Sequence, residues 1–573
     1  MDSKKQPLTL TVLDTSGIQP YIFGANNLRQ SVGASELVRW ATEDAVREAL
    51  LEVCGPNGVN VDAENLIPGR YLAFPPQEQE ATPGLTAEWL NAGGGNTLIL
   101  FENIDTAKEF TRVLTLKLYD KAPGVNLIVA HEEMEEDEAL TAAVDRARKK
   151  AQRKKRNRQW GAPVLGLAVT ADCQFTGLPA TTEYEDRDRD LREDEPGPLL
   201  RISAEVEQKR SRSSQANERL QKLLAAELGD KYTLLMNFDQ LGVKGEASFM
   251  GVVHIDGNGM GKRVQRIADD HSTPGKNREY IEALRQFSQS VEKVSQEALK
   301  QAVKDFIATV KSEGFAEKYG GLRKERGGQN ELILPFRPIV YGGDDITFVC
   351  DGRFALSLAQ RYMAVLESQE LDDGKKLYVR GGVAVVKSHY PFARAYELAE
   401  ELAQSAKALI SERKEKDGAD CSAMDWHFGT TGLVLDLEQI RSREYTKDAP
   451  GDLVMRPVLI RSYKEISQWR RWDNFTGLIE QFRCDHRPWA GKRNKIKALR
   501  EVLRKGPGET RRFIESLGSD HELDAIDAYE DVGKSGWYGP HCAWADAIEA
   551  LDLFEILSAG DNPPTPTTEG GNE

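Results

Sequence analysis

The chain has 573 residues, 40% of them hydrophobic, and a formal net charge of −15. This length accommodates about three or four domains with real hydrophobic cores, and the negative charge argues against a protein that coats nucleic acid non-specifically. The sequence contains neither an apolar run long enough for a membrane span nor the apolar core of a signal peptide, so a cytoplasmic location is expected.

The first predicted unit, residues 1–131, begins with an apolar strand that ends at Asp14. The segment after this strand reads Ser16-Gly17-Ile18-Gln19-Pro20. Further on, Gly93-Gly94-Gly95-Asn96 joins two apolar runs, which predicts a hairpin with a glycine turn. Another strand is expected at residues 125–130.

The next stretch, residues 132–235, is predicted to be a charged helical linker. Acidic residues come first and basic residues last, between 149 and 158, an order that complements a helix dipole. A solvated helix face is favoured there over a patch for nucleic acid or an acidic partner. Residues 181–197 have no apolar periodicity and are expected to form a mobile loop.

The six cysteines form no CxxC pair, so neither a disulfide framework nor an ordinary zinc site is expected. Cys173 lies in a segment that resembles a degenerate zinc knuckle. Thr176 stands where a second cysteine would complete the pair. One thiolate is too few ligands for zinc, so no metal is expected in this segment.

A second unit is predicted over residues 236–425. Its first strand, of the buried type, ends at Asp256 and is followed by a glycine-rich loop over residues 257–261 and then by a helix. An aspartate at a strand end is well placed to bind a metal. Free backbone amides in a loop near a helix start suit a triphosphate.

Further along this unit, Gly342-Gly343-Asp344-Asp345 lies between two runs of apolar β-formers, which predicts a hairpin. Glycines supply the positive φ of such a turn and let a ligand approach the backbone. Hard divalent cations bind through carboxylates and substrate phosphates, and a pair of them is the usual device for nucleotidyl transfer. Taken alone, the motif fits a solvated turn equally well.

These patterns together predict an active site. Asp256, Asp344 and Asp345 are the predicted catalytic residues and, with the adjacent Ile255, the predicted site for two Mg²⁺ or Mn²⁺ ions. The predicted nucleotide-binding residues are Gly257, Asn258, Gly259, Met260, Gly261, Gly342, Gly343 and Lys407. Lys407 belongs to a helix expected from about 391 to 410, where a solvated lysine is the alternative interpretation.

The two units repeat one layout, because Asp14 and the 93–96 turn recur at a similar spacing as Asp256 and the Asp344-Asp345 turn. This repetition predicts two palm domains related by duplication. The expected fold class is α+β, with two ferredoxin-like palm domains and a helical C-terminal domain. The first palm has Gly95-Asn96 where the second has two aspartates, so it is not expected to hold a catalytic metal pair.

The C-terminal region, residues 426–558, has helical periodicity, and residues 559–573 are expected to be a disordered tail. His427 stands near Asp425, but a histidine flanked by aromatic residues is more often packed than catalytic. The segment 487–505 is basic. A helical bundle packed on the palm and a surface for partners remain open for this region.

The chain resembles the large polymerase-like subunit of type III CRISPR effector complexes. The resemblance rests on the Asp344-Asp345 hairpin, the strand and loop at 251–261, the 10–23 segment, and Leu28-Arg29 followed by Val32-Gly33-Ala34-Ser35-Glu36-Leu37. It covers most of residues 8–410. It implies a composite pocket for two nucleotides between the palms and a C-terminal domain that contacts partner subunits and guide-target RNA. The HD nuclease domain common in that family is not expected, since the first palm starts by residue 8, so the resemblance points to a short relative.

The resemblance implies a nucleotidyltransferase that makes cyclic or linear oligonucleotide messengers, from ATP, in antiviral defence. One alternative is a non-enzymatic scaffold that binds nucleotide or RNA in a CRISPR-type ribonucleoprotein. Another is a GGDEF-like dinucleotide cyclase, whose hairpin continues with Glu-Phe where this chain has Asp345-Ile346. A template-directed polymerase fits the net charge of −15 less well. The expected partners are nucleoside triphosphates, with other CRISPR-type subunits, RNA and self-association left open.

Overall fold

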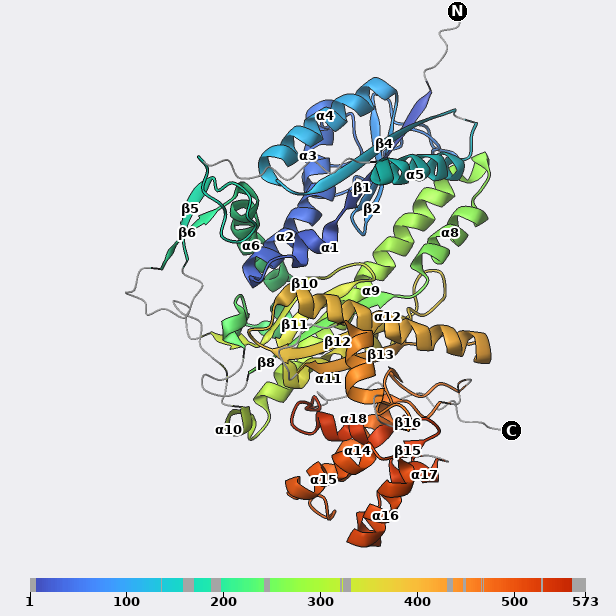
Figure 1. Ribbon diagram of the computed structural model, residues 1–573. Helices are drawn as coiled ribbons and strands as arrows, with labels where there is room; N and C mark the ends of the chain where they lie inside the picture. The colour runs from blue at the N-terminus through green and yellow to red at the C-terminus, as the bar shows by residue number, and fades with distance from the viewer. Residues whose placement is uncertain are drawn as a thin grey trace, which may run out of the picture.

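The computed structural model describes residues 7–135, 137–157, 169–186, 197–241, 248–319, 322, 331–429, 436–446, 450–464, 466, 468–526 and 529–558. In these ranges the chain forms two α/β domains and a helical domain, one below the other in Figure 1. Part of the predicted mobile loop, residues 187–196, and the predicted tail, residues 559–573, lie outside the described residues.

The first α/β domain, palm 1, has a four-stranded antiparallel sheet in the order β2-β3-β1-β4. Apolar side chains on both faces of its central strand β1 are buried, because helices cover both sides of this sheet. The elements are β1 (Leu8–Ser16), α1 (Ile18–Phe23), α2 (Leu28–Thr42), α3 (Asp44–Cys54), β2 (Ala87–Gly93), β3 (Asn96–Phe101), α4 (Ile104–Lys121), β4 (Asn126–Met134) and α5 (Leu140–Asn157).

The second α/β domain, palm 2, repeats this order as β10-β11-β8-β12 and extends its sheet with β13 and β14. The duplication predicted from spacing is therefore visible as two sheets of the same topology. The elements are β8 (Phe249–Gly257), α8 (Met260–Asp270), α9 (Asn277–Lys311), α10 (Phe315–Tyr319), β10 (Phe336–Val340), β11 (Ile346–Asp351), α11 (Ala355–Ser368), β12 (Val379–Lys387), α12 (Phe392–Asp417), β13 (Ala423–Gly429) and β14 (Val458–Leu459).

A short connecting region joins the palms and places a helix against palm 1. Helix α6 packs on α2, and Gly33 of α2 is needed there because a Cβ would stand 1.6 Å from the carbonyl oxygen of Lys209. The elements are β5 (Thr182–Glu185), β6 (Leu199–Ile202), α6 (Ala204–Leu223), α7 (Ala225–Leu228) and β7 (Tyr232–Leu234), which pairs with β9 (Leu332–Leu334).

The proposed boundaries at residues 131 and 425 both fall inside strands, β4 and β13. The charged segment that starts at residue 132 thus finishes β4 and then forms α5. Helix α5 buries Ala143, Val144 and Ala147 against palm 1 and α9. The buried side chains of α5 are mostly alanines, and charged residues surround them in the sequence. The sequence alone therefore predicted a linker.

The C-terminal domain packs on palm 2 through aromatic side chains. Trp426 of β13 lies 4.6 Å, centroid to centroid, from Phe475, and Trp489 and Trp544 are fully buried around Phe482. The elements are α13 (Leu437–Arg441), α14 (Trp472–Arg483), α15 (Arg493–Leu503), α16 (Pro507–Leu517), α17 (Glu530–Ser535), β15 (Trp537–Tyr538), β16 (His541–Cys542) and α18 (Ala543–Ala550). None of the helices in the described part of the chain has the length and hydrophobicity that crossing a membrane requires.

The two palms are joined by a buried ionic contact. Glu88 of β2 is fully buried and accepts hydrogen bonds from Arg278 of α9 at 2.8 and 3.2 Å. Arg285, two turns later, donates to the main-chain oxygens of Trp89 and Leu90 at 2.5 and 2.6 Å. These contacts fix the edge strand of palm 1 against the long helix of palm 2.

A second contact joins palm 1 to helix α12 of palm 2. The ring of Phe23 in α1 stacks on Tyr396 with 3.7 Å between centroids. The side-chain oxygen of Asn26 accepts a hydrogen bond from the first backbone amide of α12, at Phe392 (2.9 Å). Helix α1 therefore lies along the helix that covers the sheet of palm 2.

Helix α12 approaches its sheet closely because Gly382 of β12 has no side chain. A Cβ at Gly382 would lie 1.9 Å from the carbonyl oxygen of Ala399 and 2.5 Å from the amide nitrogen of Ala403. Both are backbone atoms of α12, so neither can turn aside.

We expect Gly382→Ala to lower the free energy of unfolding by about 2 kcal/mol or more, because α12 would have to move away from the sheet. Chemical denaturation measures this change. Gly477→Ala in α14 is the control, since a Cβ there meets nothing within 4 Å. Equal stability of the two variants would contradict the close packing of α12.

The ionic contact between the palms gives a second prediction. Glu88→Gln should cost about 3 kcal/mol of stability, because it leaves two arginines of α9 without their buried counter-charge. Glu109→Gln, at an exposed pair with Arg112, should cause no measurable change. If both variants unfold at the same denaturant concentration, the buried pair contributes nothing to stability.

Candidate active site

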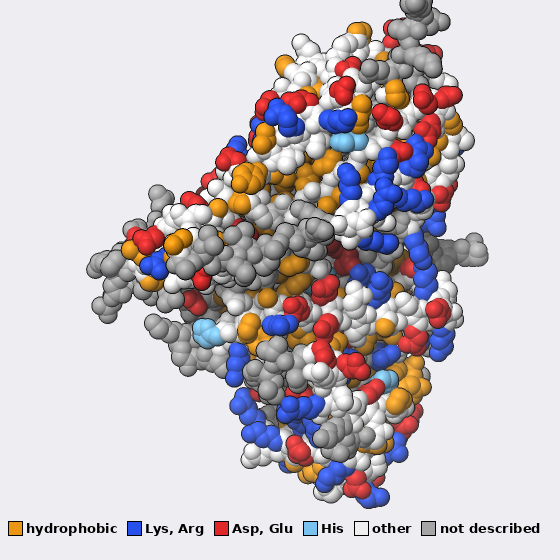
Figure 2. Space-filling view, turned by 45° about the horizontal axis from the view of Figure 1, so that its top comes forward, with side chains coloured by type: hydrophobic (Ala, Val, Ile, Leu, Met, Phe, Trp, Pro, Cys, Tyr) orange, Lys and Arg blue, Asp and Glu red, His pale blue; other side chains and the backbone are white. Residues whose placement is uncertain are grey.

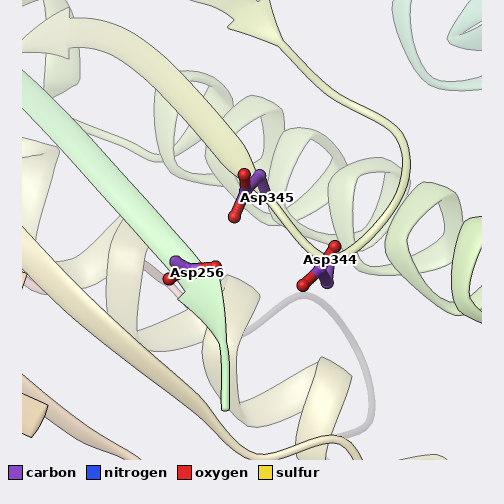
Figure 3. Close-up of side chains that lie close together, drawn as sticks. All are labelled: Asp256, Asp344 and Asp345. Carbon is purple, nitrogen blue, oxygen red and sulfur yellow. The ribbon is translucent and has the colours of Figure 1, made fainter. Parts of the chain in front are cut away.

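Three aspartates of palm 2 meet at one end of its sheet. Asp256 is the penultimate residue of β8, and Asp344 and Asp345 occupy the turn before β11, the strand paired with β8 (Figure 3). One carboxylate oxygen from each of the three lies within 4.8 Å of the others. In the described part of the chain, no other group of three or more His, Cys, Asp or Glu side chains is arranged to hold a metal ion.

Glycines make this convergence possible. Gly342 and Gly343 have φ values of 99° and 81°, a conformation that other residues rarely adopt, so the predicted glycine turn of the hairpin is present. Across from it, a Cβ on Gly257 would stand 2.7 Å from the Cβ of Asp344 and 2.9 Å from its Oδ2. Gly257 therefore leaves the room that Asp344 occupies beside Asp256.

The aspartate pair of the turn is electrostatically strained. Partial desolvation of the Asp345 carboxylate, together with the negative charges of Asp344 and Glu400, raises its pKa to about 7. Burial likewise raises the pKa of Asp344. Desolvation and mutual repulsion both disfavour the ionised pair, and a bound cation would relieve the two effects.

Arginine provides the cation that this structure places at the site. Arg380 of β12 faces Asp256 across the sheet and forms an ion pair with its Oδ2. Arg380 also donates a hydrogen bond to Oδ1 of Asn258 (3.3 Å). Its Nε is buried with no acceptor, as is Nδ2 of Asn258, so the ion pair leaves polar groups of the site unsatisfied.

The predicted loop residues lie directly beside the carboxylates. Gly259 has φ 72° and precedes helix α8, which begins at Met260. The amide of Asn258 donates to the carbonyl of Tyr378 (2.8 Å), which ties the loop to the start of β12. The first amides of α8 thus open next to Asp256, a position that suits a phosphate group.

Two of the predicted site residues, Ile255 and Lys407, make fewer contacts that support their predicted roles. Ile255 is a buried apolar side chain in β8, so only its main-chain oxygen is a candidate ligand. Lys407 lies on α12 with an exposed side chain, and no ion pair joins it to another residue in the described ranges.

The sequence analysis missed three polar residues near the carboxylates: Arg380, Glu400 and His254. His254 of β8 is hydrogen-bonded to Thr347 of β11 (3.1 Å), and burial lowers its pKa to about 4. Glu400 of α12 accepts a hydrogen bond from Gln19 of palm 1 (3.3 Å). Only the register of β8 with β12 would have revealed Arg380, and only the packing of α12 would have revealed Glu400.

Palm 1 contains a counterpart of this site with a different counter-charge. Asp14 lies near the end of β1, the strand equivalent to β8, and pairs with Lys155 of α5 at 2.5 Å. Asn96 stands opposite Asp14 in the paired strand β3, where palm 2 has carboxylates. An ammonium group thus occupies the place beside Asp14 that a metal would need.

Two other sequence expectations concern residues away from the carboxylates. His427 is buried, lies against Tyr445 and has its pKa lowered to about 4 by burial, which fits a packed residue. On the basic segment of α5, the exposed side chains include those of Lys149, Arg153 and Arg156. Figure 2 shows Lys and Arg side chains gathered on the upper right of one face. The exposed side chains agree with either a solvated helix face, the favoured interpretation, or a patch for nucleic acid or an acidic partner.

The residues present fit a divalent cation. Three converging carboxylates are the hard oxygen ligands that Mg²⁺ and Mn²⁺ prefer, and the raised pKa values of Asp344 and Asp345 fit a site whose negative charge the protein does not neutralise fully. Asp256, Asp344 and Asp345 would hold the cations, with further oxygens from a bound phosphate.

The fold and the carboxylate site define a palm domain of the polymerase and cyclase class. Residues 249–418 match the family of the second palm domain of Cas10/Cmr2, so the resemblance to the large subunit of type III CRISPR effector complexes is confirmed for this domain. No curated protein matches the chain in sequence.

Several solved structures are distantly similar to this chain. A Csm1–Csm4 cassette in complex with cA3 is 15% identical, with 97% of this chain and 71% of that chain covered and a TM-score of 0.48. A Csm1–Csm4 cassette in complex with AMPPNP is also 15% identical, with coverages of 96% and 70% and a TM-score of 0.47. Csm1 of T. onnurineus is 13% identical, with coverages of 96% and 70% and a TM-score of 0.45.

The raised pKa of Asp345 predicts how cation binding depends on pH. Below about pH 7 a proton competes with the cation for this carboxylate, so Mn²⁺ affinity should rise with pH and level off above neutrality. Titrations of Mn²⁺ at several pH values measure this. Asp345→Asn should bind weakly and lose the inflection. An inflection that persists in that variant would assign it to another group.

Proposed function

We propose that this chain is a nucleotidyltransferase that joins nucleoside triphosphates, ATP foremost, into cyclic or linear oligonucleotide messengers. The observation that carries the proposal is the convergence of Asp256, Asp344 and Asp345 within a domain of the Cas10/Cmr2 second-palm family. A role in CRISPR-related antiviral defence follows from the same family.

Each part of the site has a role in this reaction. Asp256, Asp344 and Asp345 would hold two Mg²⁺ or Mn²⁺ ions, which activate the attacking ribose hydroxyl and stabilise the pyrophosphate leaving group. The glycine loop at 257–261 and the first amides of α8 bind the triphosphate through the backbone. Gly342 and Gly343 let the nucleotide approach the turn, and Lys407 adds a positive charge along α12. Catalysis is mainly a matter of positioning and charge neutralisation.

Palm 1 supplies the other wall of the nucleotide site in this proposal. Helix α1 follows β1 directly and lies along α12, with Gln19 in contact with Glu400 beside the carboxylates. Since Asp14 is already paired with Lys155, palm 1 contributes position and not metal binding. Two nucleotides would face each other across this junction, one of them held by the catalytic carboxylates.

The partners in this proposal are nucleotides and other subunits of a CRISPR-type complex. Several of the similar solved structures are Csm1–Csm4 cassettes, and some of these contain cA3, cA4 or AMPPNP. The exposed cations of α5 and the basic segment 487–505 are the candidate surfaces for RNA or a neighbouring subunit.

Replacing both Asp344 and Asp345 by alanine should abolish product formation and leave the fold intact. The assay incubates the purified chain with each labelled nucleoside triphosphate and Mg²⁺ or Mn²⁺, with and without RNA, and identifies products by mass spectrometry. Asp269→Ala with Asp270→Ala is the matched control, because these adjacent aspartates are exposed at the end of α8.

The outcomes of this experiment separate the possible functions. Cyclic or linear oligoadenylate that depends on the aspartate pair supports the proposal, and a dinucleotide made from GTP would point to a GGDEF-like cyclase. Product formation by the double variant would refute the two-metal assignment. Nucleotide binding without turnover under every condition would point to a scaffold.

A further inference from the structure

The ion pair between Arg380 and Asp256 lies where the proposed function needs a free carboxylate. Asp256 is one of only three carboxylates in the cluster, and the guanidinium of Arg380 contacts its Oδ2 directly. A guanidinium and a divalent cation repel each other and cannot share one carboxylate oxygen at close range. Arg380 must therefore withdraw before the Oδ2 oxygen of Asp256 can act as a ligand.

Withdrawal needs a second acceptor, because the side chain of Arg380 is only 12% exposed. A charge left buried without a partner costs several kcal/mol, which would make cation binding unfavourable. The hydrogen bonding of Arg380 in its present position is also incomplete, since its Nε has no acceptor. A second position that satisfies the Nε would therefore be favourable, and it must include a carboxylate to balance the charge.

Glu400 has the properties of that acceptor. It projects from α12, the helix packed on β12, and is partly buried. No ion pair joins it to another residue in the described ranges, and one amide hydrogen bond, from Gln19, reaches its Oε1 at 3.3 Å. Its negative charge acts on Arg380, where it raises the pKa against the effect of burial, and on Asp345.

We propose that Arg380 is a movable counter-ion of the carboxylate site, which pairs with Asp256 in the cation-free protein and transfers to Glu400 when a divalent cation binds. This inference rests on the cation site of the proposed function. It assigns Arg380 and Glu400 as positioning residues, and it makes the cation affinity depend on a residue that touches palm 1 through Gln19.

A double-mutant cycle on cation affinity tests the transfer without any turnover. Mn²⁺ binding to the nucleotide-free full chain is measured by electron paramagnetic resonance of free Mn²⁺, for wild type, Glu400→Gln, Arg380→Gln and the double variant. We expect Glu400→Gln to weaken binding about tenfold, and Arg380→Gln to strengthen it. In the Arg380→Gln background, Glu400→Gln should change the affinity by no more than about twofold, because no guanidinium then needs an acceptor.

Two controls accompany the cycle. Glu397→Gln changes an exposed carboxylate about one turn away on α12, paired with Arg394, and should leave Mn²⁺ affinity unchanged. Arg380→Lys keeps a positive charge near Asp256. If circular dichroism shows that Arg380→Gln does not fold, Arg380→Met supplies the neutral background instead. With lysine in place, the effect of Glu400→Gln should persist.

The results distinguish this inference from the proposed function. An equal effect of Glu400→Gln in both backgrounds, or weaker binding by Arg380→Gln, would overturn the transfer, because Glu400 would then act as a simple negative charge. If wild type binds Mn²⁺ and Asp345→Asn does not, the cation site itself stands even when the cycle shows no coupling. Absence of Mn²⁺ binding by wild type would overturn both.

Discussion

The convergence of three carboxylates at one end of the sheet is the constraint that shapes palm 2. Asp256, Asp344 and Asp345 are held within one ligand shell, and the protein loses solvation and gains repulsion by holding them there. The glycines at 257, 342 and 343 allow the approach, and the strands β8 and β11 fix it through their backbone ladder. The energy needed to assemble such a site comes from the buried sheet and from the helices packed on it.

The junction of the two palms gives a structural role to palm 1, whose described residues contain no such carboxylate cluster. Contacts that fix palm 1 to palm 2 include the buried pair of Glu88 with Arg278 and the stacking of Phe23 on Tyr396. Both contacts use elements that border the active end of palm 2, α9 and α12. In the proposed function, such a rigid second wall would reduce the entropy that two nucleotides lose when they are brought together.

Much of this arrangement could be predicted from the sequence, because local patterns specify it. The strand that ends at Asp256, the glycine turn before Asp344 and the repeated spacing in the first palm depend on residues close together in the chain. Arg380 and Glu400 were not predicted from the sequence. Arg380 lies near Asp256 because β12 pairs with β8, and Glu400 lies near Asp345 because α12 packs closely on Gly382. Such long-range register has no local signature.

Helix α5 shows the opposite limit of sequence reasoning. Its charge pattern was interpreted correctly as helical, but its buried stripe consists of small residues such as Ala143 and Ala147, whose hydrophobic signal is weak. The helix therefore looked like a connector. In the structure α5 packs on β4 and β1 of palm 1, as α12 packs on the equivalent strands β12 and β8 of palm 2.

The pairing of Asp14 with Lys155 makes the two palms differ in what they require from their surroundings. A lysine is attached to the chain, so its charge beside Asp14 does not depend on the concentration of any ion in solution. In palm 2, a positively charged side chain, that of Arg380, pairs with only one of the three carboxylates. Depletion of divalent cations would therefore alter one half of the duplicated unit and leave the other unchanged, so that palm 1 remains a fixed reference surface while its partner gains or loses charge.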